Sequence, residues 1–248
     1  MHPSSVVIHV PHASTLIPDA ERGSFRANLK DELLKMTDMY CGELFCGEYK
    51  SVVFPVSRLV CDPERFRSDA DEPMSRVGMG AVYTRTHSGQ TLREVGEAGR
   101  ERILRAYYDP HHAGFTAAVQ AALDRTGGCL IIDGHSFCPR PLPYEQDQNP
   151  VRPDFCIGSD PFHTPKRLEE AAVVFLRERG FTAAVNAPFA GAIVPMRFYR
   201  RDARVRSVMI EVNRRLYMRG DGSKNSAFVE IRRTVRELMR FIIGECRP

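Results

Sequence analysis

The chain has 248 residues, of which 43% are hydrophobic and 27% charged, a composition typical of globular proteins. Its 35 basic and 31 acidic residues leave a formal net charge of +4 and form no block of like charge, which argues against nucleic acid as a partner. The seven cysteines include no C-x-x-C pair, so they indicate a reducing compartment rather than a disulfide framework. A chain of this length can bury a core without a structural metal, so we expect any bound metal to serve chemistry.

The sequence shows no signal for secretion or for membrane insertion. Residues 1–4 are not a basic segment followed by a long apolar core. No apolar stretch approaches the ~20 residues that a membrane helix needs. We therefore expect a cytoplasmic protein that has no membrane partner.

Segments typical of strands and of helices alternate along the chain. Short β-branched or apolar runs predict strands, and apolar residues three or four positions apart predict helices. The predicted strands are 5–10, 52–56, 59–61, 81–84, 129–133, 155–158, 183–185 and 207–212. The predicted helices are 28–49, 92–108, 109 to about 125 (with Asp109 as N-cap and Pro110 at the first helical position), 164–179 and 225–243. Residues 65–80 and 136–153 are predicted loops.

This alternation predicts an α/β fold in one domain over residues 1–248. Helices should lie on both sides of a central mixed, largely parallel sheet, which gives three α/β/α layers. In open sheets of this kind, ligands bind beyond the carboxyl ends of the strands. Residues that follow the predicted strands are therefore the first candidates for a site.

Three such positions carry chemically active side chains. His12 follows the first strand, the segment Asp133-Gly134-His135-Ser136 comes at the end of the strand at 129–133, and Glu211 lies inside an apolar strand. A single histidine is more often structural than a ligand, and Asp-Gly is a common turn. A carboxylate such as Glu211 is costly to bury unless a partner compensates it. Two histidines and carboxylates at one sheet edge together indicate a catalytic zinc site with an open position for water.

Several motifs, in this order, make the assignment more specific. They are Val10-Pro11-His12, Thr37-Asp38, Glu43-Leu44-Phe45, Ser57-Arg58-Leu59-Val60-Cys61-Asp62 ending in Arg65, Asp133-Gly134-His135-Ser136, Asn186-Ala187-Pro188-Phe189-Ala190-Gly191, and the run from Ile210 to Met218 that contains Glu211 and Arg214. With these motifs the chain resembles the N-formylglutamate amidohydrolase family over most of its length. The resemblance implies a fold similar to that of zinc carboxypeptidases and aspartoacylase, with one Zn²⁺ ion.

The resemblance also implies metal ligands. His12 and His135 would bind zinc. The related peptidases have a glutamate three residues after the first histidine, but this chain has Thr15 there. Asp38, expected on the first helix in the matching Thr-Asp context, is our choice for the third ligand. A helical aspartate that faces solvent is the alternative.

Roles for other residues follow from the same resemblance. Glu211 would be the general base that takes a proton from the attacking water and passes it to the leaving amine. The cationic anchors for a substrate carboxylate would be Arg58, Arg65 and Arg214, since a guanidinium holds a carboxylate in two parallel hydrogen bonds, and Asn186 belongs to a matching motif. His112 and His87 are further candidates, with ordinary surface histidines as the alternative.

The chain departs from the family pattern in two places. Asp62-Pro63-Glu64-Arg65 stands where the family has Asp-x-Asn-Arg, and Ala13-Ser14 follows the first motif histidine in place of Ser-Gly. The anionic Glu64 stands beside an expected anchor for a substrate carboxylate. This departure therefore bears on the identity of the substrate more than on the type of reaction. We expect hydrolysis of N-formylglutamate to formate and glutamate, a step of histidine degradation. The alternatives are another N-formyl or N-acyl amino acid as substrate, or a relative that binds a ligand without catalysis.

Overall fold

The computed structural model describes residues 5–246. Residues 1–4, on which the expectation about a secretion signal rests, lie outside the described part, as do residues 247–248. None of the helices in the described part is both long enough and apolar enough to cross a bilayer.

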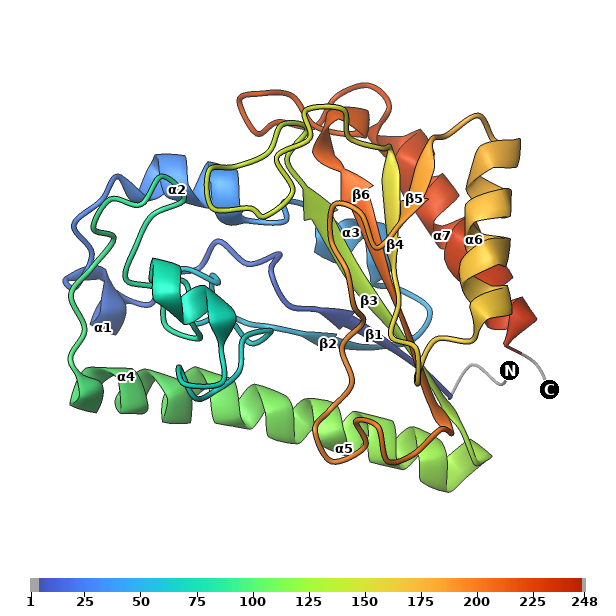
Figure 1. The fold of residues 1–248 in the computed structure, drawn as a ribbon, viewed down its shortest axis with the longest axis horizontal. Helices are drawn as coiled ribbons and strands as arrows, with labels where there is room; N and C mark the ends of the chain where they lie inside the picture. The colour runs from blue at the N-terminus through green and yellow to red at the C-terminus, as the bar shows by residue number, and fades with distance from the viewer. Residues whose placement is uncertain (1–4, 247–248) are drawn as a thin grey trace.

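A mixed sheet forms the centre of the fold (Figure 1). Within residues 5–246 its strand order is β2-β1-β3-β6-β4-β5. Every neighbouring pair is parallel except β4 and β6, which are antiparallel. The strands are β1 Val6–Val10, β2 Lys50–Val53, β3 Cys129–Phe137, β4 Phe155–Gly158, β5 Ala183–Val185 and β6 Val205–Asn213. The predicted mixed, largely parallel sheet is therefore confirmed.

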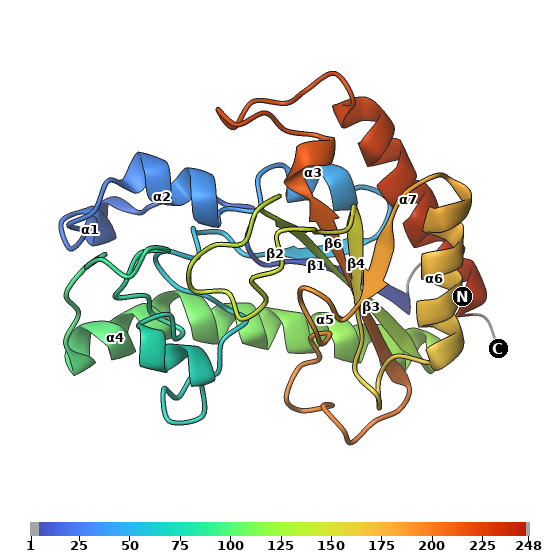
Figure 2. The same cartoon turned by 45° about the horizontal axis from the view of Figure 1, so that its top comes forward.

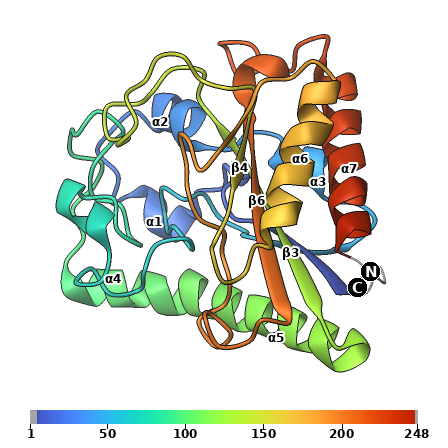
Figure 3. The same ribbon diagram turned by 45° about the vertical axis from the view of Figure 1, so that its right-hand side comes forward.

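Helices cover both faces of this sheet. On one face, α5 (Asp109–Thr126) contacts β1, β2 and β3. On the other face, α3 (Cys41–Phe45) contacts β1 and β3, while α6 (Lys166–Glu178) contacts β4 and β5. Helix α7 (Phe228–Glu245) packs against α3 and α6, and Figure 3 shows α6 and α7 side by side. The three-layer α/β/α arrangement is confirmed.

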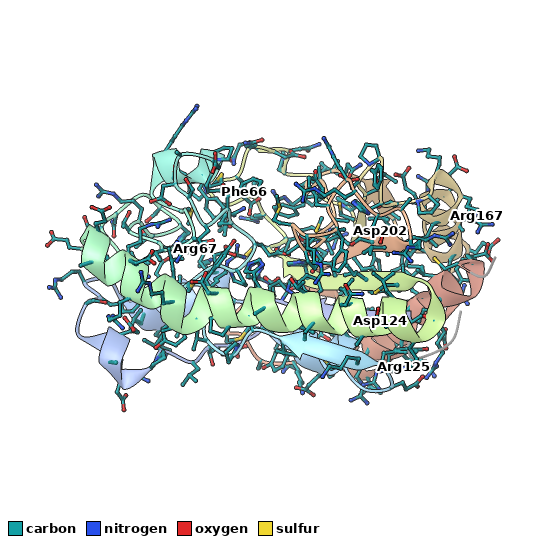
Figure 4. The ribbon with its side chains drawn as sticks, turned by 90° about the horizontal axis from the view of Figure 1, so that it is seen from below. Phe66, Arg67, Asp124, Arg125, Arg167 and Asp202 are labelled. Atoms are coloured by element: carbon teal, nitrogen blue, oxygen red, sulfur yellow. The ribbon has the colours of Figure 1, made fainter. Side chains whose placement is uncertain are left out.

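The remaining helical segments of the described part are short. They are α1 Asp19–Arg22, α2 Leu29–Met36, a 3-10 helix Pro73–Val77, α4 Glu97–Ile103, a π-helical segment Leu104–Tyr108 and a 3-10 helix Arg214–Leu216. Figure 4 shows α5 in front of the sheet, with Asp124 and Arg125 near its carboxyl end and Arg67 over its other end.

Side-chain alternation along β3 gives its two faces different environments. Leu130 and Ile132 point into the core formed with α3, α6 and α7. Cys129 and Ile131 point to the opposite face and pack in the core that includes Phe115 of α5. Asp133 and His135 continue this second face, so it changes from apolar to polar toward the carboxyl end of β3. The polar end of this face is where the site forms.

The helix predicted at 28–49 is broken in the structure. Helix α2 ends at Met36 and α3 begins at Cys41, because Thr37 is extended (φ −83°, ψ 136°) and Tyr40 has φ +67°. The intervening Asp38 donates its backbone N–H to the carbonyl of His12 at 3.0 Å. The expectation that Asp38 lies on a helix is therefore wrong. Its buried contacts override the helical periodicity, and the break turns Asp38 toward the sheet edge.

A π-helical segment replaces the predicted boundary at Asp109-Pro110. Helix α4, the π-helical segment Leu104–Tyr108 and α5 follow one another without interruption. Proline inside a helix has no N–H to donate and its ring clashes with the carbonyl four residues earlier. A π-helical turn widens the helix just before Pro110, which accommodates the ring without ending the helix.

Two predicted strands are wrong for a common reason. Residues 59–61 form a turn that is held by Ser57, whose carbonyl accepts from Val60 N at 2.8 Å. Residues 81–84 are irregular as well, with Thr84 N bonded to Gly78 O at 2.8 Å. Both segments are apolar because they fill the core beside α2 and the π-helical segment. A buried irregular segment has the same short run of apolar residues as a buried strand, so the sequence pattern alone did not distinguish them.

The packing of Gly134 yields a testable prediction. Gly134 precedes His135 in β3, and a Cβ atom at this position would lie 2.6 Å from the Phe45 ring of α3. Gly134→Ala is therefore expected to destabilise the fold by roughly 1–3 kcal/mol through overpacking. Urea unfolding measures this change. Gly114→Ala on α5 is the control, since its Cβ meets nothing within 4 Å and alanine favours a helix; an equally stable Gly134→Ala variant would contradict the packing argument.

Candidate metal and active site

A polar cavity of about 180 Å³ lies at the carboxyl ends of the central strands. His12 enters it just beyond β1, His135 from β3 and Glu211 from β6. The loop that joins β3 to β4 supplies further wall residues, including Leu142 and Tyr144. Figure 2 shows this loop leaving the strand ends toward the side of the molecule that holds α2. Three candidates from distant parts of the sequence thus line one cavity.

His12 is oriented by the buried Asp62. Its Nε2–H donates to Asp62 Oδ1 at 2.8 Å, and Asp62 Oδ2 accepts from Arg58 Nη2 at 2.8 Å and from Tyr83 Oη at 2.6 Å. Burial opposes ionisation, but Arg58 and His12 hold the pKa of Asp62 well below its ordinary value. The ionised carboxylate fixes the tautomer in which His12 Nδ1 carries the lone pair. That nitrogen is buried and has no hydrogen-bond partner in the described part of the chain.

His135 lies among three carboxylates. Its Nδ1 is 3.2 Å from Asp38 Oδ2, and its Nε2 is 3.2 Å from Glu64 Oε1 and 3.1 Å from Asp133 Oδ1. Burial disfavours the charged ring, but Glu64 and Asp133 hold the pKa of His135 well above its ordinary value. The Asp133-Gly134-His135-Ser136 segment lies inside β3, so the prediction that the strand ends at Asp133 is wrong. The longer strand fixes His135 on a rigid backbone.

The donor atoms of His12, Glu64 and His135 lie within 4.8 Å of one another. Two imidazoles and a carboxylate are donors that catalytic zinc sites use, with a fourth position left open. The unpaired Nδ1 lone pair of His12 lies 3.8 Å from Glu64 Oε2, on the inner side of this group. The residues therefore fit a divalent metal such as zinc.

A second group, His9, Glu64 and Asp133, also brings three donor residues together. Here the histidine nitrogens are already hydrogen-bonded: His9 Nδ1 pairs with Asp133 Oδ1 at 2.8 Å and His9 Nε2 with His111 Nε2 at 3.0 Å. Burial lowers the pKa of His111 to about 2, with His9 adding to the effect, so its ring is neutral. We interpret this group as a buried support for Asp133 and, through it, for His135.

Glu211 lies beside His135 at the inner end of the cavity. The two residues are partners on neighbouring parallel strands, so their side chains point to the same face. Glu211 Oε2 is buried and has no hydrogen-bond partner among residues 5–246. Burial raises the pKa of Glu211 to about 8, against the opposing effect of His135. A carboxyl group in this setting can exchange a proton with a bound water or substrate.

Arg58 and Arg65 bring two guanidinium groups to the same cavity. Arg58 donates through Nε to Tyr83 Oη at 3.2 Å and through Nη2 to Asp62, which leaves its Nη1 without a partner among the described residues. Arg65 Nε lies 3.7 Å from Asp62 Oδ2 and is buried without a hydrogen bond there. Both side chains keep donors that an anionic ligand can use.

Arg214 and Asn186, two further predicted substrate anchors, are engaged within the protein. Arg214 lines the cavity, but its nitrogens bind Ser136 Oγ, Ser136 O, Lys35 O, Cys138 Sγ and Asp38 Oδ1. Those five contacts use all five N–H groups of a guanidinium. Asn186 Oδ1 accepts from the backbone N–H groups of Ser159 and Gly191, and its Nδ2 donates to Ser159 Oγ at 2.8 Å. Asn186 thereby shapes the loop whose Phe189 and Ala190 line the cavity.

The two further histidine candidates occupy different places. His112 Nε2 donates to the carbonyl of Pro63 at 2.8 Å, so it supports the segment that carries Glu64. His87 Nδ1 lies 2.6 Å from Glu32 Oε1, and neither residue lines the cavity. The structure therefore brings His112 next to the site and leaves His87 outside it.

Sequence reasoning missed Glu64, His9 and Lys35 as site residues. Glu64 was visible as a departure from the family pattern, but its role depends on a turn that no periodicity predicts. His9 had a clear signal, because it is a histidine inside a buried apolar strand, as Glu211 is a carboxylate inside one. Lys35 lines the outer part of the cavity from α2, and its ammonium has no partner in the described part of the chain.

The fold and the cavity together define an α/β protein with the type of site that a hydrolase uses. Residues 4–218 match the model of the N-formylglutamate amidohydrolase family, and the chain belongs to this family. Membership makes the protein a hydrolase of the amidohydrolase type. A comparison with curated protein sequences finds no match.

Solved structures share the fold over nearly the whole chain. One is N-formylglutamate amidohydrolase from Ralstonia eutropha JMP134, with 23% identity, a TM-score of 0.83, and coverage of 97% of this chain and 93% of that one. Another is a gene product of Agrobacterium tumefaciens, with 20% identity, a TM-score of 0.69, and coverage of 98% and 94%. At these identities the likeness shows the fold.

Proposed function

We propose that the chain is a metal-dependent amidohydrolase that cleaves N-formyl-L-glutamate to formate and L-glutamate, with residues 1–248 acting as one domain. The observation that carries the proposal is the cavity in which His12, His135 and Glu64 surround one point beside the unpaired carboxyl of Glu211. Family membership supports the substrate. The same proposal places the reaction in the cytoplasm, as a step of histidine degradation.

His12 and His135 would hold the metal, together with one carboxylate. When bound, a zinc ion supplies a Lewis acid for the formyl carbonyl and lowers the pKa of a water molecule to about 7. Each of the two histidines is oriented by a carboxylate that contacts its other ring nitrogen. Asp62 orients His12, while Asp38, fixed by Arg214 at 2.8 Å, orients His135. Carboxylates that hold the histidine ligands in this way are a regular part of zinc sites.

Glu211 would carry the proton. As the carboxylate, it takes a proton from the water that attacks the formyl carbon, and then gives it to the nitrogen of the departing glutamate. Glu211 lies on β6 beside His135 and is not among the three residues whose donor atoms could hold a metal, which supports this role. The high pKa that burial imposes on Glu211 suits the second half of this cycle, in which the group must act as an acid.

The substrate carboxylates would be bound by cations at the outer part of the cavity. Arg58 and Arg65 keep free donors, so we assign them to one carboxylate. Arg214 has none left, so we propose that it positions Asp38 rather than the substrate. A dicarboxylate needs another cation, and Lys35 is a cavity-lining cation without an internal partner in the described part of the chain.

Lys35→Met is expected to raise the KM for N-formylglutamate roughly tenfold, the equivalent of about 1.4 kcal/mol. The KM for N-formylglutamine, which has a neutral amide at the same place, is expected to change less than twofold. Formate release over both substrates measures the effect, and Lys30→Met on the exposed face of α2 is the control. Equal changes for both substrates would remove Lys35 from carboxylate recognition. Hydrolysis of N-formylaspartate but not N-formylglutamate by the unaltered chain would contradict the proposed substrate.

A further inference from the structure

The metal site needs a carboxylate, and two candidates lie beside its histidines. We propose that Glu64, rather than Asp38, is the ligand that completes the site with His12 and His135. This inference rests on the metal-dependent function proposed above. It concerns a residue at which the chain departs from its family's pattern, since glutamate stands where that pattern has asparagine.

The Glu64 carboxylate lies between the two imidazoles. Its Oε1 is 3.2 Å from His135 Nε2 and its Oε2 is 3.8 Å from His12 Nδ1. Donors that share a tetrahedral zinc ion, each bonded at 2.0–2.2 Å, are separated by roughly 3.3–3.6 Å. The carboxylate is therefore close to a bonding position relative to both nitrogens. His12 Nδ1 has no hydrogen-bond partner in the described part of the chain, and His135 Nε2 is the ring nitrogen that Asp38 does not contact.

The backbone that carries Glu64 is held from three sides. Glu64 N donates to Asp62 Oδ1 at 3.0 Å, His112 Nε2 donates to Pro63 O at 2.8 Å, and Tyr108 Oη donates to Arg65 O at 2.8 Å. Tyr108 ends the π-helical segment and His112 lies one turn later in α5. The widened helix thus fixes the residues on either side of Glu64, as a metal ligand requires.

The other carboxylates near the histidines are already used. Asp38 Oδ1 accepts from Arg214 Nη2 at 2.8 Å, and its Oδ2 faces His135 Nδ1 and Ser136 N, each at 3.2 Å. To coordinate a metal through Oδ2, Asp38 would have to release the nitrogen that it orients. Asp133 Oδ1 accepts a hydrogen bond from His9 at 2.8 Å. Asp38 Oδ2 also lies 3.7 Å from His12 Nδ1, but both Asp38 oxygens accept hydrogen bonds from Arg214 and Ser136. Glu64 has an 18% exposed side chain whose two oxygens each face one imidazole.

Calorimetric titration of Zn²⁺ into the metal-free full-length protein tests the assignment. Glu64→Gln keeps the size of the side chain but removes its charge, and it is expected to raise the Kd for Zn²⁺ at least 100-fold. Asp38→Asn is expected to raise it roughly tenfold, the lower end of the range for a residue that acts behind a ligand. Glu211→Gln makes the same chemical change in the same cavity and is expected to bind Zn²⁺ within threefold of the unaltered chain. Glu64→Asp, which keeps the charge but draws the carboxylate back by one carbon, is expected to weaken Zn²⁺ binding more than Asp38→Asn does and less than Glu64→Gln does.

Unaltered Zn²⁺ affinity in Glu64→Gln, with a large loss in Asp38→Asn, would overturn the assignment and leave the metal-dependent function standing. Failure of the unaltered chain to bind Zn²⁺ would overturn both. A thermal melt of each metal-free variant shows that it is folded before titration. If Glu64→Gln does not fold, the comparison of Glu64→Asp with Asp38→Asn decides, because only a ligand role for Glu64 predicts weaker binding when its carboxylate is merely drawn back.

Discussion

Replacing Glu211 by glutamine is expected to lower kcat by roughly 10²–10⁴ while the protein keeps its metal. Glutamine has the same shape but can neither accept nor deliver a proton. The side chain lies next to His135 and does not belong to the group of donor atoms that could hold a metal. Formate release and elemental analysis of the same preparation measure the two quantities together.

The same substitution is expected to stabilise the metal-free protein, with a melting temperature raised by about 2–4 °C. Glu211 is buried with an unpaired oxygen and its pKa is raised to about 8, so the gain is expected above that pH, where the group is ionised and a neutral amide is less costly to bury. A variant that is more stable but less active than the unaltered chain is the expected result when the replaced residue serves catalysis rather than folding. Glu94→Gln, at an exposed position outside the cavity, is the control for both measurements. Activity in Glu211→Gln within twofold of the unaltered chain would exclude it as the general base.

The sequence was informative wherever local pattern and burial agree. The strand at 155–158 and the strand at 183–185 have the predicted bounds, and the helix predicted at 164–179 matches α6 closely. Glu211 stood out because a carboxylate inside an apolar strand is costly unless it has a function. His9 carries the same kind of signal on β1, so the buried support of the site could have been found by applying the argument a second time.

Residues whose roles depend on contacts between distant segments could not be assigned from the sequence. Asp38 leaves the helical path because Arg214, 176 residues away, and Ser136 hold its carboxylate. Arg214 resembled a substrate anchor in sequence, and only its contacts in the folded protein show that its donors are all engaged. Glu64 faces the histidines because a π-helical turn carries Tyr108 and His112 to its flanks. Periodicity describes one element at a time, whereas each of these roles needs two or three.

Removing one metal-facing nitrogen at a time is expected to abolish zinc binding and, with it, detectable hydrolysis. His12→Gln keeps a donor near Nε2 for Asp62 but has no group at the place of Nδ1. His135→Asn keeps a donor near Nδ1 for Asp38 but has none at the place of Nε2. Each variant keeps the hydrogen bond to the orienting carboxylate, Asp62 or Asp38. A loss of zinc can therefore be attributed to the missing ligand atom. Zinc content after dialysis and formate release are the measurements.

The two variants should differ in stability, which separates metal binding from folding. His135 is the cation among Asp38, Asp133 and Glu64, and loss of one partner from a buried ion pair costs roughly 3–5 kcal/mol. Metal-free His135→Asn is therefore expected to melt well below the unaltered chain. His12→Gln retains its hydrogen bond to Asp62 and should melt close to it. His12→Gln removes only the Nδ1 donor. If the folded variant kept its zinc and its activity, His12 would not be a metal ligand, and the proposal that His12 and His135 share one ion would be wrong.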